Sequence, residues 1–142
     1  MATTNIKIRI ADWEKDQQDL AAIRRQVFIE EQSVPEVLEW DEADKTSTHF
    51  LATVDNKAVA TVRLTVNGQI GRMAVLPEYR NQGIGSRLLG FVIQTAASQG
   101  IKQLYLHAQV AAIPFYAKHG FQVNGDVFYE AYIAHREMQM KI

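Results

Sequence analysis

The sequence predicts a single α/β (α+β) domain, built on a mixed, mostly antiparallel central sheet of six to seven strands flanked by helices. Three β-rich runs, at residues 49–54, 58–66 and 69–75, are separated by the turn sequences "DNK" and "NG", which indicates antiparallel hairpins. A helical stripe follows and connects the third run to an apolar run at 103–108. Such a crossover makes these two strands parallel neighbours. No repeat or linker divides the chain, so we expect one domain over residues 1–142.

Local patterns predict the remaining elements. Residues 6–10 alternate apolar and charged side chains, which is typical of a half-buried strand. Apolar residues recur at helical spacing from about Gln17 to Glu31, and residues 33–48 form an acidic loop with one helical turn. The segment 111–119 is predicted to be a short helix, because Pro114 is tolerated in a first turn. Strand-like segments then end the chain, and their exposed edges make a homodimer as plausible as a monomer.

Composition excludes several classes of function. The formal net charge is −1, so no overall basic field would draw the chain to nucleic acid or to an anionic membrane. The chain has no cysteine, which excludes disulfides, thiolate metal sites and a cysteine nucleophile. His49, His119 and His135 are not spaced as a metal triad, and we expect no metal. The first ten residues lack the apolar segment of a signal peptide, so a cytoplasmic location is expected.

The stretch "MAVLPEYRNQGIGSRLL" joins a strand to a helix through a glycine turn. Gly83 and Gly85 leave the backbone open, so the amides of residues 82–86 could form an anion nest at the positive end of the helix dipole. Arg80 would add a full positive charge. Leu88 stands where a dinucleotide fingerprint needs its third glycine, and no Walker lysine is present. Phosphate binding is favoured, with a purely structural turn as the alternative.

Two segments of this sequence resemble signatures of the GNAT N-acetyltransferase superfamily. "RNQGIG" matches the pattern [RQ]-x-x-G-x-[GA] of its acetyl-CoA loop, and "AQVAAIPFYAKHGF" resembles its tyrosine motif downstream. The predicted element order is also that of the family. The segments "RRQVFIEEQSVP", "EWDEADKTSTHFLA" and "FYEAYIAHREM" further resemble the ElaA-like branch of small bacterial GNAT proteins.

The resemblance implies acetyl-CoA as a co-substrate and assigns residues to it. Met73 and Val75, with Ala74 between them, would bond the pantetheine arm through the backbone of a strand that diverges from its neighbour. Gln109 stands where the family has an asparagine and, one methylene longer, would contact the arm. Phe115 and Tyr116 would also contact the coenzyme. The pyrophosphate would be held, chiefly by amides, by Arg80, Asn81, Gln82, Gly83, Ile84, Gly85 and Ser86.

The catalytic candidates differ in how strongly the sequence supports them. Tyr116 matches the family tyrosine that protonates the departing thiolate, although the residue pattern alone also fits a packing aromatic. His107 and Glu130 are both candidate bases for the acceptor amine. Their structural alternatives are a hydrogen-bonded strand histidine and a solvated edge carboxylate. Candidate residues for acceptor binding come from the first helix and the acidic loop: Glu31, Trp40 and Asp41.

We therefore expect an acetyl-CoA-dependent N-acetyltransferase that moves an acetyl group to a primary amine of a small molecule or protein. Direct transfer in a ternary complex is expected, because no cysteine is present to carry the acyl group. The alternatives are a non-catalytic acyl-CoA-binding or sensing module on the same fold, and an interaction protein whose glycine turn is only structural.

Overall fold

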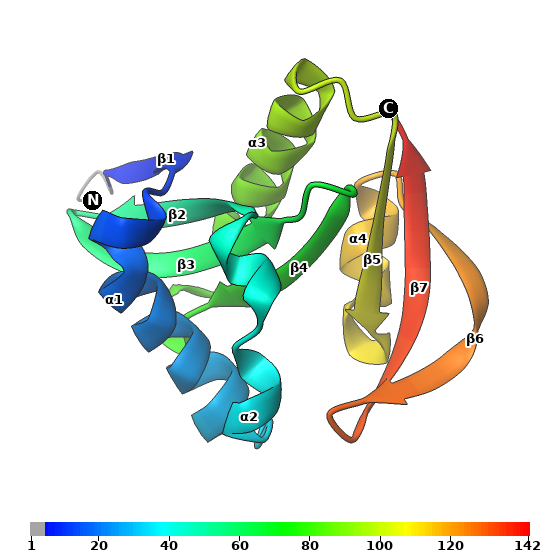
Figure 1. The fold of residues 1–142 in the computed structure, drawn as a ribbon, viewed down its shortest axis with the longest axis horizontal. Coiled ribbons are helices and arrows are strands. Elements are labelled where there is room, and N and C mark those ends of the chain that lie inside the picture. The colour runs from blue at the N-terminus through cyan, green and yellow to red at the C-terminus, as the bar shows by residue number, and fades with distance from the viewer. Residues whose placement is uncertain (1–4) are drawn as a thin grey trace.

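A computed structural model describes residues 5–142 and contains one seven-stranded sheet in the order β1-β2-β3-β4-β5-β7-β6 (Figure 1). All neighbouring strands are antiparallel except β4 and β5, which are parallel. The predicted fold class is thereby confirmed, including the parallel pair. The strands are β1 (Ile6–Ile10), β2 (Thr48–Val54), β3 (Lys57–Leu64), β4 (Gln69–Val75), β5 (Gln103–Gln109), β6 (Gln122–Glu130) and β7 (Ile133–Lys141).

Turn residues fix the register of the first hairpins. Asp55 and Asn56 join β2 to β3 with φ of 50° and 69°, the left-handed pair that matches the twist of a two-residue hairpin. Gly68, before β4, has φ +89°, and a Cβ there would lie 2.6 Å from the Gln103 carbonyl oxygen. Only glycine therefore fits where the β3–β4 turn passes the start of β5.

Helices cover both faces of the sheet near its centre. The α1 helix (Trp13–Arg24) packs on β3 and β4, and α3 (Ile84–Ser98) packs on β1 to β4 from the opposite face (Figure 1). Residues 59–64 of β3 are consequently all buried, since successive side chains point to opposite faces. The short α4 (Ile113–Lys118) packs against β5 and β6.

The first helix differs from its predicted bounds. It begins at Trp13, because the Asp12 carboxylate accepts hydrogen bonds from the amides of Glu14 and Lys15 and caps the helix. After Arg24 the chain continues as a π-helical segment, Arg25–Glu31. Such segments are uncommon and occur frequently at functional sites.

The end of the chain is a long hairpin of two strands. Residues 121–125 and 127–131 are two of the strand-like segments expected at the end of the chain, and both contribute to the single strand β6. The pairing of β6 with β7 is irregular between Asn124 and Phe128. The turn to β7 is made by Ala131 and Tyr132, with φ of 49° and 67°. The Asn-Gly pair thus marks a bulge within a strand, although it is also typical of a hairpin turn.

The acidic loop is more ordered than predicted, and arginines hold it. It contains α2 (Glu36–Glu39) and a 3₁₀ turn, Glu42–Lys45. Arg24, 1% exposed, donates from Nε to Glu39 at 2.7 Å and from an Nη to Asp44 at 2.8 Å. Burial raises the pKa of the Glu39 carboxyl. Burial alone would also raise the pKa of Asp44, but its hydrogen bonds from Arg24 and Arg63 lower it.

Within residues 5–142, no helix is both long enough and apolar enough to cross a membrane. The same residues contain no group of three or more His, Asp or Glu side chains arranged to hold a metal ion.

Candidate functional site

The cleft arises where β4 separates from β5. The two strands pair only at Gln69 and Ile70, and their remaining residues diverge. Arg72, with φ +52°, produces a bulge at which the β3–β4 register shifts. From Gly71 to Val75 the β4 edge that faces β5 therefore has no ladder partner in the described structure.

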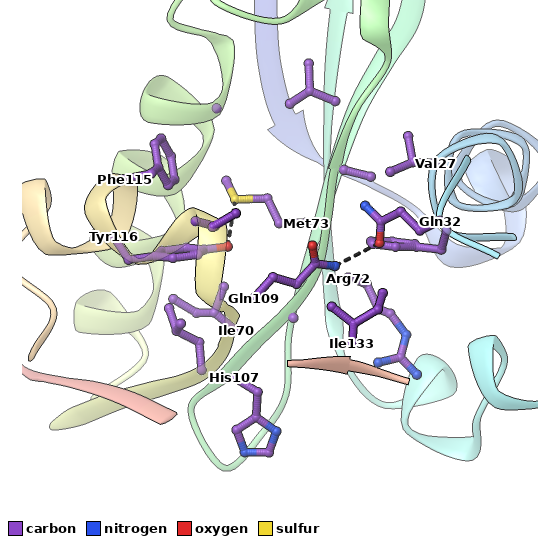
Figure 2. Close-up of a pocket in the computed structure, with 18 of the residues that line it drawn as sticks. Val27, Gln32, Ile70, Arg72, Met73, His107, Gln109, Phe115, Tyr116 and Ile133 are labelled. Atoms are coloured by element: carbon purple, nitrogen blue, oxygen red, sulfur yellow. Dashed lines mark hydrogen bonds between the residues drawn. The ribbon is translucent and has the colours of Figure 1, made fainter. Parts of the chain in front are cut away.

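A cleft of about 1190 Å³ occupies this opening, between the π-helical segment on one side and β5, α4 and β7 on the other (Figure 2). It brings together most of the predicted site residues, from the glycine turn to both candidate bases. Gln82 does not line it; this side chain is exposed and donates to the Glu78 carbonyl at 3.1 Å. The predicted residues that line the cleft are Met73, Ala74, Val75, Arg80, Asn81, Gly83, Ile84, Gly85, Ser86, His107, Gln109, Phe115, Tyr116 and Glu130.

The glycine turn has the geometry of an anion-binding helix start. Gly83 is the N-cap of α3 at φ +80°, and the first-turn amides of an α-helix have no carbonyl one turn earlier to bond. The Phe115 ring lies over Gly85, 3.5 Å from where a Cβ would be. His119 Nε2 lies 3.0 Å from the Ser86 hydroxyl. The turn therefore offers free backbone donors at the positive end of the helix dipole.

Arg80 has a partner that the sequence analysis did not assign to it. Its Nη atoms donate to both carboxylate oxygens of Glu31 at 2.7 Å, and its Nε donates to the Val75 carbonyl at 2.9 Å. The Arg80 hydrogen bond lowers the pKa of Glu31. The end of the π-helical segment is thus fastened to the glycine turn, and Glu31 does not line the cleft.

Tyr116 reaches the middle of the cleft from α4. Its hydroxyl donates to the Met73 sulfur at 3.5 Å (Figure 2). Burial raises its pKa to about 12, because an apolar environment disfavours the phenolate. The phenol is therefore protonated throughout the neutral range and is already directed at a sulfur atom.

His107, His135 and Glu130 line the far end of the cleft, and Glu137, which does not line it, lies near His107. His107 Nδ1 lies 3.0 Å from a Glu130 carboxylate oxygen, and His107 Nε2 lies 3.9 Å from Glu137. His135 is 8% exposed; its Nδ1 lies 2.7 Å from the Ile133 carbonyl and its Nε2 4.0 Å from Glu130. The two candidate bases are therefore in direct contact with each other.

Gln109 bridges the cleft. Its side-chain amide donates to Gln32 at 2.8 Å, which joins the end of β5 to the residue after the π-helical segment (Figure 2). An asparagine, one methylene shorter, would not span the same distance from this backbone position. The longer side chain at this position thus has a structural partner within the protein.

The other two candidate acceptor residues lie outside the cleft lining and interact with arginines. The Trp40 ring stacks with the guanidinium of Arg24, 5.0 Å from the ring centroid. Asp41 accepts from Arg63 at 2.7 Å and from Arg72 at 3.1 Å. The negative charge of the acidic loop is largely neutralised by these arginines.

Sequence reasoning missed several residues that shape the cleft. Gly71 inside a strand pattern was an available signal for the bulge at Arg72. No local pattern pointed to Gln32 or His135, because their roles depend on partners 77 residues away and on a neighbouring strand, respectively. Long-range pairing of this kind has no signature in a single sequence.

Comparisons with known proteins agree with this geometry. A sequence model for the acetyltransferase (GNAT) domain matches residues 11–142. The chain is 34% identical over 137 residues to YjcF of Bacillus subtilis, named an uncharacterized N-acetyltransferase, covering 94% of this chain and 98% of that protein. The crystal structure of Escherichia coli ElaA superposes with a TM-score of 0.83 at 26% identity, covering 94% and 98% of the chains. Arabidopsis thaliana Naa50, solved with the bisubstrate analogue CoA-Ac-MVNAL, shares the fold (TM-score 0.76, 23% identity, 96% and 99% covered).

Proposed function

Because this chain belongs to the GNAT acetyltransferase family, in the branch of ElaA, we propose that it transfers an acetyl group from acetyl-CoA directly to a primary amine. The observation that carries this proposal is the single cleft that runs from the glycine turn, past the Tyr116 hydroxyl, to the His107–Glu130 pair. A donor and an acceptor bound at its two ends would meet beside Tyr116. Direct transfer is favoured because the sequence contains no cysteine to carry the acyl group.

The residues of the cleft fit coenzyme A. The first-turn amides of α3 suit its pyrophosphate, and the unpaired edge of β4 offers backbone groups for the amides of its arm. When bound, the coenzyme supplies the acetyl group as an activated thioester. A backbone N–H within Met73–Val75 would then be the donor to the thioester carbonyl oxygen.

Tyr116 would act on the leaving sulfur. Proton transfer from a phenol with a pKa of about 12 to a sulfur of ordinary thiol pKa, about 8.5, is uphill by roughly 5 kcal/mol. The hydroxyl would therefore act first as a hydrogen-bond donor that stabilises negative charge on sulfur. In this structure the hydroxyl donates to the Met73 sulfur at 3.5 Å, a weak acceptor that a thiolate could replace.

His107 and Glu130 would receive the proton of the acceptor amine. An ammonium must lose a proton before its nitrogen can attack, and the 3.0 Å contact between His107 Nδ1 and Glu130 couples the two groups. Either residue can accept the proton directly from the acceptor amine, and the hydrogen bond between them then shares that proton. His107→Gln or Glu130→Gln is expected to lower kcat by about 10²-fold, measured by steady-state kinetics with thiol release.

Calorimetric titration with acetyl-CoA, followed by an amine screen with thiol-release detection, tests the proposal. Saturable binding and amine-dependent thiol release are expected. Binding without release for any amine would favour a sensing module. No heat at millimolar acetyl-CoA would contradict the phosphate site itself.

Replacing Glu31 tests whether the charge of Arg80 contributes to the affinity for acetyl-CoA. Glu31→Gln frees the Arg80 guanidinium from its carboxylate partner, so a bound pyrophosphate would gain a cation nearby. The pair is more than one-third exposed, and the expected gain in acetyl-CoA affinity is modest, up to about 5-fold. Calorimetry at low and high salt measures it, since the gain should shrink with screening.

The matched control for Glu31→Gln is Glu36→Gln. Glu36 pairs with Arg25 at a similarly exposed site, and neither residue lines the cleft. This control should leave the affinity unchanged. An affinity for Glu31→Gln equal to or below that of the parent would mean that Arg80 does not contribute its charge to donor binding.

A further inference from the structure

The acceptor end of the cleft has apolar rims. On one side α2 carries Val37 and Leu38, which are 82% and 52% exposed. On the other side the β6–β7 turn carries Tyr132, which is 87% exposed. Leu38 lines the cleft from α2. Ile133, next to Tyr132, lines it from β7 (Figure 2). Leu38 and Ile133 thus line the cleft from two different elements, and each is next in sequence to an exposed apolar residue that does not line it.

Two charged groups lie at the same end of the cleft. Arg72 pairs with Glu39 at 3.3 Å and with Asp41 at 3.1 Å, so its positive charge is balanced, and Glu130 beside His107 forms the negative pole. Glu130 lines the cleft and lies 3.0 Å from His107 Nδ1. Glu137 lies 3.9 Å from His107 Nε2, does not line the cleft and accepts from the Asn124 and Gln139 side chains. Among residues 5–142, neither carboxylate forms an ion pair with an arginine or lysine. The pole therefore complements a single positive charge.

Elsewhere around the cleft the carboxylates are already neutralised. Glu31 pairs with Arg80, and Glu39 pairs with Arg24. Asp41 pairs with Arg63. A second cationic group on the acceptor, such as that of a polyamine, would find no free carboxylate among these, and a polyhydroxylated body would meet apolar rims.

We infer that the acceptor is a primary amine carried on an apolar body, an alkyl- or aralkylamine. The inference rests on the proposed function and names the substrate class of that site. The ammonium lies at the Glu130–His107 pair, and the hydrocarbon lies between Leu38 and Ile133. The positive charge of the acceptor is thereby matched to the carboxylate of the cleft, and its hydrocarbon to the apolar side chains.

A homologous series of amines tests the inference. Thiol release is measured with butylamine, hexylamine, octylamine and phenethylamine, and with spermidine, glucosamine and a lysine-bearing peptide. Each methylene that becomes buried should raise kcat/KM by about 3- to 4-fold until the rims are covered. Spermidine, glucosamine and the peptide should fall below hexylamine.

Leu38→Ser should flatten this dependence on chain length, and Val66→Ser is the matched control. Val66 is 72% exposed on the β3–β4 turn and does not line the cleft. Because both positions are exposed, both variants should keep the parent's unfolding midpoint. Ile133→Ser provides a second variant on the opposite wall.

The outcomes test the apolar acceptor and the acetyltransferase activity separately. Acetylation that does not depend on chain length, or that favours spermidine, glucosamine or the peptide, overturns the apolar acceptor and leaves the acetyltransferase assignment standing. Saturable acetyl-CoA binding without acetylation of any amine overturns both. A rising series that Leu38→Ser flattens and Val66→Ser preserves supports the inference.

Discussion

Tyr116→Phe is expected to lower kcat by about 10²- to 10³-fold while leaving the affinity for acetyl-CoA nearly unchanged. The substitution removes one hydroxyl whose present partner is the Met73 sulfur, and phenylalanine keeps the ring in its packed position. Charge develops on the leaving sulfur only during transfer, so the loss should fall on kcat and not on ground-state binding. Steady-state kinetics with thiol release and calorimetry on the same preparation measure both quantities.

Tyr105→Phe is the control, because Tyr105 lies on β5 and its side chain does not line the cleft. It should keep the parent rate. The pH profile adds a second check: with a pKa of about 12, Tyr116 keeps its proton up to about pH 11, so its ionisation cannot cause a fall in kcat between pH 8 and 10. A parent-like rate for Tyr116→Phe would exclude the assigned role.

Arg24→Met is expected to reduce the free energy of unfolding by about 3–5 kcal/mol. Arg24 is 1% exposed and bonds two carboxylates that are themselves buried, Glu39 and Asp44. Methionine approximates the length of the arginine stem but leaves both carboxylates without this partner. Urea denaturation followed by circular dichroism measures the loss, which corresponds to a fall in melting temperature of roughly 10 °C.

The same change at an exposed arginine supplies the comparison. Arg9 pairs with Asp16 at 2.7 Å, but its side chain is 52% exposed. Arg9→Met should cost about 1 kcal/mol or less, because the guanidinium is exposed and the Asp12 backbone N–H still donates to the Asp16 carboxylate. Equal losses for the two variants would mean that the buried ion pairs contribute no more than a surface pair.

The sequence predicted the helices and strands that are determined by residues near them in the chain. Alternation and turn residues located β2, β3 and β4, and the helical stripe after Gly83 gave both α3 and the parallel strand that follows it. The start of α1 was missed because its cap, Asp12, lies before the apolar periodicity begins. The Asn-Gly pair of β6 was ambiguous, since the same dipeptide fits a bulge and a hairpin turn.

For the candidate site, the sequence located the side chains but not their partners. The glycine turn and the tyrosine motif pointed to the donor end because both depend on short contiguous segments. Glu31 shows why the partners could not be predicted. Its place in an acidic region suggested acceptor binding, yet its carboxylate is bonded to an arginine 49 residues later in the chain. Charge runs reveal the number of charges, and only the fold determines which of them are neutralised.

The divergence of β4 from β5 also has a consequence for solubility and for detecting the donor. An unpaired strand edge on a protein surface invites pairing with another chain, but this edge lines the cleft between β4 and β5 and is not an outer edge of the sheet. Its amides within Met73–Val75 that point away from β3 should exchange with deuterium rapidly in the free protein. Acetyl-CoA should slow that exchange and leave the β1–β2 ladder unchanged, so occupancy of the donor site can be read without any acceptor.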